Sequence, residues 1–217
     1  MKRFMLPLVL LFLPVLAFAG SVELEWPAVI TCIDSNGVSS PCDPDGYKVY
    51  FGTSPRDTAV PPAGYTDSRN VGPVLNATID QLADCTDYYF GVTAVRGLEE
   101  STVYSPELVG WPAPAVISTA PDTLERGYTY TLDVAGNNFK AGVQVLTSSG
   151  DVSILQVRVV SCTLLAVDVT LAPGSNLGSF SLEARNDDGS YAEQLGAFTI
   201  IKKSPGPVQD LRRSNVR

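Results

Sequence analysis

The sequence contains no histidine among its 217 residues. Histidine is the side chain best suited to acid–base catalysis near neutral pH, so its absence excludes Ser-His-Asp and Cys-His catalysis and most zinc and haem sites. Basic residues are also scarce, with 15 Lys and Arg against 23 Asp and Glu and a net charge of −8. This acidic balance argues against nucleic acid and anionic membrane surfaces as partners.

Paired carboxylates remain as candidates for catalysis of the glycosidase type. They occur in turn-like sequence, at Asp43-Pro44-Asp45-Gly46 and Asn186-Asp187-Asp188-Gly189, where Asn, Asp and Gly are favoured for their backbone conformations. Residues 34–37 and 43–46 also carry the oxygen ligands that calcium prefers, but neither segment continues into an EF-hand loop. We expect no catalytic, cofactor-binding or metal-binding residue, with calcium binding at these turns as the alternative.

Long apolar runs are equally scarce, and the longest lies at the start of the chain. Lys2 and Arg3 precede an apolar run from Phe4 to Leu16, and Ala17-Phe18-Ala19 fits the small-residue pattern at which export signals are cut. The run is too short and too rich in proline for a membrane span. Residues 1–19 are therefore predicted to be a signal peptide. The expected location is secreted, extracellular, periplasmic or at the cell surface, with no transmembrane segment after cleavage.

The rest of the chain shows the period-2 alternation of β-strands and no sustained helical period. In the first segment, glutamates alternate with Val22, Leu24 and Trp26. Two later segments alternate in the same way: one face carries Tyr47, Val49 and Phe51, which alternate with Lys48 and Tyr50, and another carries Tyr88, Phe90, Val92 and Ala94, with Tyr89 among the residues between them. Two prolines in residues 111–114 interrupt the pattern with a short, stiff connector. We predict an all-β chain with one domain at 20–110, a linker at 111–114 and a second domain at 115–201.

Three separated patterns in residues 20–110 resemble those of a fibronectin type III domain. They are Trp26 at the end of the first strand, the strand-like segment 46–53, and Leu82 six positions before Tyr88. The resemblance implies a tyrosine corner, in which Tyr88 buries its ring and bonds its hydroxyl to nearby backbone. Trp26 and Tyr88 are thus expected to be structural residues.

Residues 115–201 are similar to the IPT/TIG group of immunoglobulin-like domains. The similarity lies in Ala120-Pro121, in the turn Gly136-Asn137-Asn138-Phe139, and in the hairpin sequence 186–189 ahead of Phe198. Gly and Asn tolerate the positive φ that tight reversals need. Together, the two resemblances imply two consecutive immunoglobulin-like β-sandwiches after a cleaved signal peptide.

Four cysteines in an exported chain indicate disulfides, with three connectivities available. Cys32 and Cys42 flank a polar loop, so a staple across that loop is the leading pair. The fibronectin type III resemblance implies that Cys85 lies at the end of its domain nearer to the second one. A bridge from Cys85 to Cys162 would then clamp the domains together, and the alternative is two buried, unpaired thiols.

The same resemblance implies that the first domain lacks its first strand, because cleavage after Ala19 leaves the tryptophan strand near the new N-terminus. A missing strand exposes unpaired backbone along a sheet edge. Residues 202–217 form a basic tail, and within it residues 204–212 look like the opening of another fibronectin type III domain. Strand donation by this tail to a second subunit is one hypothesis, with Val208, Leu211 and Arg212 as partner-binding residues. The alternative is a disordered basic tail.

These features predict a non-catalytic, secreted or cell-surface protein that binds or scaffolds through protein–protein contacts, in adhesion or assembly. The expected partner is another protein or a second copy of the chain. The alternative is a carbohydrate-binding or accessory module of an extracellular polysaccharide-processing system. Sugar rings stack on exposed aromatic side chains, for which Tyr50, Tyr65 and Tyr104 are the candidates.

Overall fold

The structure is a computed structural model of the chain that describes residues 20–33 and 38–202. All regular structure in these residues is β, so the prediction of an all-β fold is confirmed. Within the same residues there is no helix with the length and apolarity that crossing a membrane requires. The expected signal peptide and the tail residues Val208, Leu211 and Arg212 lie outside the described residues.

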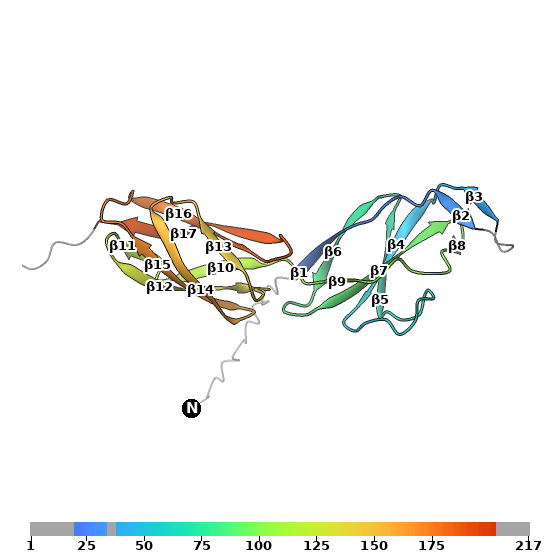
Figure 1. Cartoon of the computed structure of the whole chain (residues 1–217), viewed down its shortest axis with the longest axis horizontal. Helices are drawn as coiled ribbons and strands as arrows, with labels where there is room; N and C mark the ends of the chain where they lie inside the picture. The colour runs from blue at the N-terminus through green and yellow to red at the C-terminus, as the bar shows by residue number, and fades with distance from the viewer. Residues whose placement is uncertain (1–19, 34–37, 203–217) are drawn as a thin grey trace, which may run out of the picture.

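The N-terminal part of the chain, residues 20–110, lies at the right of Figure 1. In chain order, its described strands are β1 (Gly20–Glu25), β2 (Thr31–Ile33), β3 (Ser39–Pro41), β4 (Gly46–Gly52), β5 (Asp67–Gly72), β6 (Asn76–Leu82), β7 (Tyr88–Arg96), β8 (Glu99–Glu100) and β9 (Leu108–Gly110). They form three sheets: β1 pairs with β6, β2 pairs with β3, and β5-β4-β7-β8 form a longer sheet in which β9 also pairs with β7.

A hydrophobic core fills the N-terminal part. Val22 and Leu24 of β1 point into it while Glu23 and Glu25 are exposed, as the period-2 alternation requires. The buried members of this core are Val22, Leu24, Trp26, Tyr47, Val49, Phe51, Ile79, Leu82, Tyr88 and Phe90. Trp26 and Tyr88 therefore lie where a structural role places them.

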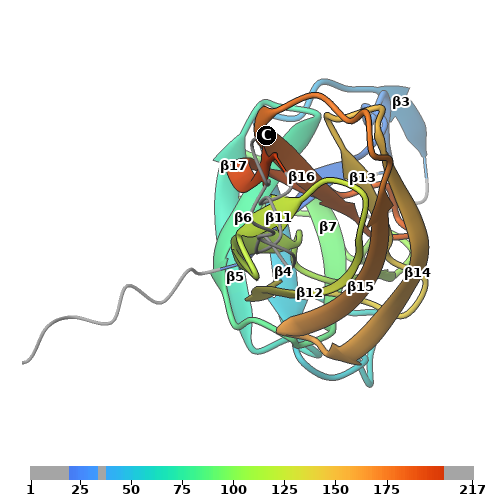
Figure 2. The same cartoon turned by 90° about the vertical axis from the view of Figure 1, so that its left-hand side faces the viewer.

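The C-terminal part, residues 115–201, lies at the left of Figure 1. Its strands are β10 (Ala115–Ala120), β11 (Thr123–Glu125), β12 (Thr129–Asn137), β13 (Gln144–Thr147), β14 (Val152–Ser161), β15 (Leu164–Leu171), β16 (Gly178–Arg185) and β17 (Tyr191–Ile201). They form two four-stranded sheets, β10-β12-β15-β14 and β11-β17-β16-β13. Figure 2 shows β12, β15 and β14 in one layer and β17, β16 and β13 in the other.

The C-terminal part has a hydrophobic core of its own. It draws on both four-stranded sheets, for example Leu132 and Leu165 from one sheet and Leu182 and Phe198 from the other. Several sheets around two separate cores are consistent with β-sandwich architecture.

Five strands of each part follow the same order and pairing. β1 and β6 pair as β12 and β15 do, β4 and β7 pair as β13 and β16 do, and β7 and β9 pair as β16 and β17 do. All six pairs are antiparallel. The two parts are therefore variants of one topology, and they differ in the strands added around it.

Candidate protein-binding groove at the junction of the two parts

Residues 111–114 connect β9 to β10, at the position where the sequence predicted a linker. The indole Nε1 of Trp111 donates a hydrogen bond to the backbone oxygen of Asn138 at 2.8 Å. The ammonium group of Lys140 lies 5.2 Å from the centre of the Trp111 ring and 3.8 Å from the carboxylate of Asp87. The linker tryptophan thus packs against residues of the C-terminal part and is not a free stacking platform.

Asn138 is the centre of a hydrogen-bond network between the two parts. Its side chain is buried, and its Nδ2 donates to Asp84 Oδ1 at 2.8 Å and to the Ala113 oxygen at 3.0 Å. Its Oδ1 accepts a hydrogen bond from the backbone amide of Cys85 at 2.7 Å. The neighbouring Asn137 donates to the other oxygen of Asp84 at 2.8 Å. One turn of the C-terminal part is therefore fastened to both the β6–β7 turn and the linker.

A third turn completes the network. Asn186, which is also buried, donates from Nδ2 to the Asn138 oxygen at 2.9 Å and accepts from the Lys140 amide at 3.1 Å. Buried amide side chains with all these partners hold turns in one geometry, because leaving any buried polar group unpaired would cost about 1–3 kcal/mol. The junction is therefore built as a rigid connection.

Two disulfides are present, with the pairings considered from the sequence. Cys32 joins Cys42 across the β2–β3 hairpin, with Cα atoms 5.5 Å apart. Cys85 joins Cys162 between the two parts, with Cα atoms 5.8 Å apart and a sequence separation of 77. Disulfides are typical of extracellular and periplasmic proteins. The second one also covalently locks the junction that Asn138 organises.

A groove of about 720 Å³ lies beside this junction. It is lined by residues 21–23 of β1, residues 108–111 at the end of β9, Ala113, and residues 188–191 of the hairpin between β16 and β17. We call this the junction groove. Since both parts contribute to its walls, its shape depends on the rigid connection between them.

One wall of the junction groove is an open sheet edge. In the described residues β1 pairs with β6 alone, and the Trp26 amide after β1 donates to backbone on that side at 3.0 Å. On the opposite side, the Ser21 oxygen accepts from the Ala113 amide at 2.8 Å. Residues two apart in a strand direct their backbone groups to the same side. The amides and carbonyls of Glu23 and Glu25 therefore face outward along this edge.

The remaining walls are apolar and acidic. Leu108 and Val109 are 52% and 54% exposed, and Tyr191 is 59% exposed. Glu23 and Asp188 contribute carboxylates, and the described lining contains no lysine or arginine. An open strand edge beside exposed apolar side chains suits an extended peptide, which pairs through its backbone and is selected through its side chains. The acidic groups favour a basic one.

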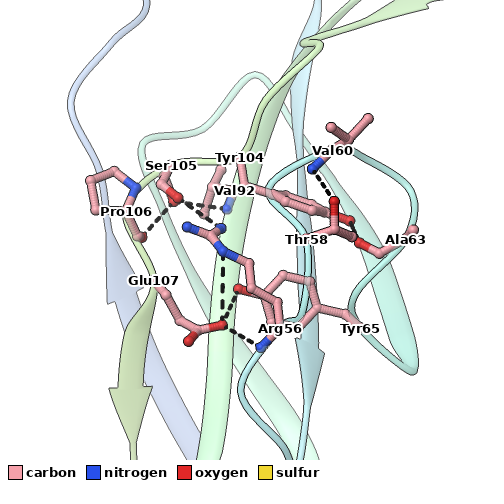
Figure 3. A network of polar contacts seen from close by, with 10 residues as sticks. All are labelled: Arg56, Thr58, Val60, Ala63, Tyr65, Val92, Tyr104, Ser105, Pro106 and Glu107. Atoms are coloured by element: carbon pink, nitrogen blue, oxygen red, sulfur yellow. Dashed lines mark hydrogen bonds and ion pairs between the residues drawn. The ribbon is translucent and has the colours of Figure 1, made fainter.

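The tyrosines expected to bind carbohydrate occupy a different place. Tyr50 and Tyr104 are only 3% and 7% exposed, and their rings meet edge to face with centroids 5.0 Å apart. The prediction that Tyr50 and Tyr104 are exposed stacking platforms is therefore wrong, because the face of β4 opposite the core is covered. The loop between β4 and β5 folds over that face and covers both rings, with the Tyr104 hydroxyl donating to the Ala63 oxygen at 2.8 Å (Figure 3).

Tyr65 belongs to the same loop and is half-buried. Its hydroxyl donates to Glu107 Oε1 at 2.9 Å, and the same oxygen accepts from the Arg56 amide at 3.0 Å (Figure 3). The Arg56 guanidinium donates to the Ser105 oxygen at 2.9 Å. These bonds fasten the loop to the segment before β9, so the cluster is a structural network.

The network shifts the pKa values of its side chains. Burial, together with the charges of Tyr50 and Glu100, raises the pKa of Tyr104 to about 12. Burial and the hydrogen bond to Glu107 raise the pKa of Tyr65 well above its ordinary value. Burial opposes ionisation of Glu100, but hydrogen bonds from Tyr50 and Thr93, together with the nearby ammonium group of Lys48, outweigh it, and the net effect lowers the pKa of Glu100. The folded state thus favours neutral tyrosines around one ionised carboxylate.

The turns considered for calcium divide between described and undescribed residues. Residues 34–37 lie outside the described residues. In the second turn, Asp45 Oδ2 accepts a hydrogen bond from the Gly97 amide at 2.5 Å, which assigns it a structural partner. No group of three or more metal-binding side chains occurs in residues 20–33 and 38–202.

The tyrosine corner occurs twice. The Tyr88 hydroxyl accepts from the Ala83 amide at 2.9 Å, as the fibronectin type III resemblance implied. The Tyr130 hydroxyl accepts from the Glu125 amide at 2.9 Å, an arrangement that the sequence reasoning missed. The signal was present, because in each case a buried leucine stands six positions before the tyrosine: Leu82 and Leu124.

The junction residues were also missed as a group. The sequence predicts turns at Asn138 and Asn186 but predicts no role for Asp84. Their turns do reverse tightly, with Asn138 at a φ of 61°. No local pattern predicts that two turns 48 residues apart meet through the hydrogen bond from the Asn186 side chain to the Asn138 oxygen.

Comparison with models of known protein families and with curated proteins finds no match for this chain. Its function has to be inferred from its own residues and geometry.

Proposed function

We propose that this chain is an exported, non-catalytic binding protein that acts through protein–protein contacts, in adhesion or assembly. Two disulfides and the signal-like residues 1–19 support export. We further propose that the N-terminal part is a fibronectin type III domain and the C-terminal part an IPT/TIG domain. The tyrosine corner at Tyr88 and the shared strand order of the two parts support this assignment.

The observation that carries the proposal is the open edge of β1 in the junction groove. Within the described residues, the unpaired backbone groups of Glu23 line the same groove as the exposed side chains of Leu108 and Val109. Proteins usually cover or blunt such an edge, because it pairs readily with any extended chain. Here it is held in place by the Asn138 network and the disulfide from Cys85. This is the construction expected of a binding site.

Carbohydrate binding has weaker support at this site. Among its described lining residues, Tyr191 is the exposed aromatic side chain, and the Arg185 guanidinium already lies 5.0 Å from the centre of its ring. A protein partner would use the backbone edge and the leucine–valine surface as well. The two functions therefore depend on different residues.

A photo-activatable cross-linking residue at Leu108, in the exporting cells, tests the proposal. We expect a covalent adduct with a protein. The control position is Leu155 on β14, which is 59% exposed and is not among the residues that line the groove. Absence of a protein adduct at Leu108, combined with glycan binding that Tyr191→Ala abolishes, would contradict the proposal and favour carbohydrate binding.

A further inference from the structure

We propose that the junction groove binds residues 205–212 of a second copy of this chain, which add a strand to the open edge of β1. This inference rests on the proposed function and names its partner. Four observations support it: a template within the molecule, the sequence of the tail, the charges of both surfaces, and the distance between them.

The C-terminal part shows how such an edge is closed. There β10 pairs antiparallel with β12 over five registered positions, and β11 then pairs parallel with β17. β12 and β17 correspond to β1 and β9 in the shared topology. One segment of 11 residues, from Ala115 to Glu125, therefore adds a strand to one edge of each sheet of the C-terminal part. In the described N-terminal part the corresponding edges of β1 and β9 are both uncovered.

The tail resembles the start of that covering segment. Pro112-Ala113-Pro114 leads into β10 and its Val116, and Pro205-Gly206-Pro207 leads directly to Val208. Proline lacks an amide hydrogen, so it is tolerated at the start of an edge strand and not within a central one. Residues 203–217 supply 15 residues, which exceeds the length that β10 and β11 use.

The charges of the two surfaces are complementary. The groove lining has two carboxylates, from Glu23 and Asp188, and no basic residue among its described members. Residues 202–217 contain five basic residues and one acidic residue. Opposite charge steers a tail toward the groove and disfavours other acidic segments of the chain. Leu108 and Val109 are about half exposed. Val208 and Leu211 supply the apolar side chains that pack against them in this arrangement.

The tail cannot reach the groove of its own chain with these residues. β17 begins at Tyr191, in the groove lining, and extends to Ile201. At about 3.3 Å per residue the strand carries the chain about 33 Å away. Returning that distance would take about ten residues, which uses up 203–212. The donor must therefore be a second copy, and repetition of this head-to-tail contact builds a linear assembly.

Sedimentation velocity of the full exported chain, beginning at Gly20, tests the inference. We expect oligomers that grow with concentration. The tail variant Val208→Asp/Leu211→Asp and the groove variant Leu108→Asp should each weaken self-association by at least about tenfold. Leu155→Asp is the matched control, because Leu155 is equally apolar and similarly exposed on the edge strand β14. It should associate like the unchanged chain.

Mixing the two variants sharpens the test, because one retains the groove and the other retains the tail. We expect their mixture to form dimers and nothing larger. Circular dichroism confirms that each variant is folded, and the tail variant leaves every described residue unchanged. A monomeric unchanged chain, or tail variants that still associate, would overturn the inference. Monomers that cross-link another protein at Leu108 would overturn it while preserving the proposed function, and monomers without adducts would overturn both.

Discussion

The N-terminal and C-terminal parts share five strands in the same order, but among the described residues only the C-terminal part has a leading segment that adds a strand to one edge of each sheet. β10 and β11 cover β12 and β17, whereas the described N-terminal part leaves β1 and β9 uncovered. Instead, the N-terminal part has a loop that covers β4 and is held by the hydrogen bond from Tyr65 to Glu107, and a β2–β3 hairpin that is cross-linked by a disulfide. The difference is that, within the described residues, no strand occupies the position beside β1 that β10 occupies beside β12.

The two parts also differ in where disulfides cross-link their shared topology. The N-terminal part is held at its far end by Cys32 and Cys42 and at the junction by Cys85. The C-terminal part contributes one cysteine, Cys162, to a disulfide, and its sheets carry the added strands β10 and β11. A sheet edge without a paired strand buries less surface, so added covalent links are a physically reasonable compensation.

The largest effect is expected from removing the disulfide between the parts. Loop-closure entropy predicts a loss of about 4.5 kcal/mol for Cys85→Ser/Cys162→Ser, whose cysteines are 77 residues apart, and about 2.7 kcal/mol for Cys32→Ser/Cys42→Ser, which are 10 apart. Urea unfolding of both variants measures the free energies. A larger loss for the Cys32 and Cys42 pair would contradict the role of the junction disulfide.

Opening the C-terminal edge by mutation would make the two parts alike. A Cβ at Gly136 would lie 1.9 Å from the Ala115 oxygen and 2.5 Å from Phe139 Cζ, so Gly136→Ala should separate β10 from β12. We expect a loss of about 1–3 kcal/mol in the free energy of unfolding. Gly150→Ala is the control, because no atom lies within 4 Å of its Cβ position. Equal stability of the two variants would show that the β10 contact is dispensable.

The paired tyrosine corners should respond alike. Tyr88→Phe and Tyr130→Phe each leave a backbone amide, of Ala83 or Glu125, without the hydroxyl it donates to. We expect each to lose about 1 kcal/mol in thermal unfolding. Tyr191→Phe, on an exposed ring, should leave stability unchanged. A loss confined to Tyr88→Phe would show that the second corner is not equivalent to the first.

The smallest effect concerns alkaline pH. The pKa of Tyr104 is raised to about 12, chiefly by burial, and those of Tyr50 and Tyr65 are raised as well. Above a pH of about 10 the unfolded chain loses protons that the folded chain keeps, so stability that is present below pH 10 falls as the pH approaches 12. Hydrogen exchange should show β4 losing protection before β15. Tyr104→Phe should reduce this slope, and an unchanged slope would contradict the assignment.

Local rules predicted a good part of the fold. Alternation predicted that Val22 and Leu24 of β1, and Trp26 directly after it, face the core, as they do. The cysteine pairs followed from the polar loop and from the resemblance. These features depend on a few neighbouring residues, whose periodicity is visible in the sequence.

Contacts between segments that are distant in the chain could not be predicted from the sequence. The alternation places Tyr50 on the face of β4 opposite the core. The loop that carries Tyr65 covers this face, and no local sequence pattern predicts that contact. The network of Asn138, Asp84 and Asn186 joins three turns through single hydrogen bonds, which leave no periodic trace. The open edge of β1 was inferred by resemblance, but its neighbours Leu108 and Tyr191 come from β9 and β17 and were not anticipated.

Hydrogen exchange at the amides of Glu23 and Glu25 tests most directly whether the edge of β1 is open and receives a second copy. In dilute solution of the exported chain, both amides should exchange fast, while the β12 amides that face β10 stay protected. At concentrations where oligomers form, both should become protected, and Val208→Asp/Leu211→Asp should abolish that change. Protection that is already complete in dilute monomers, or unaffected by the tail variant, would contradict the account.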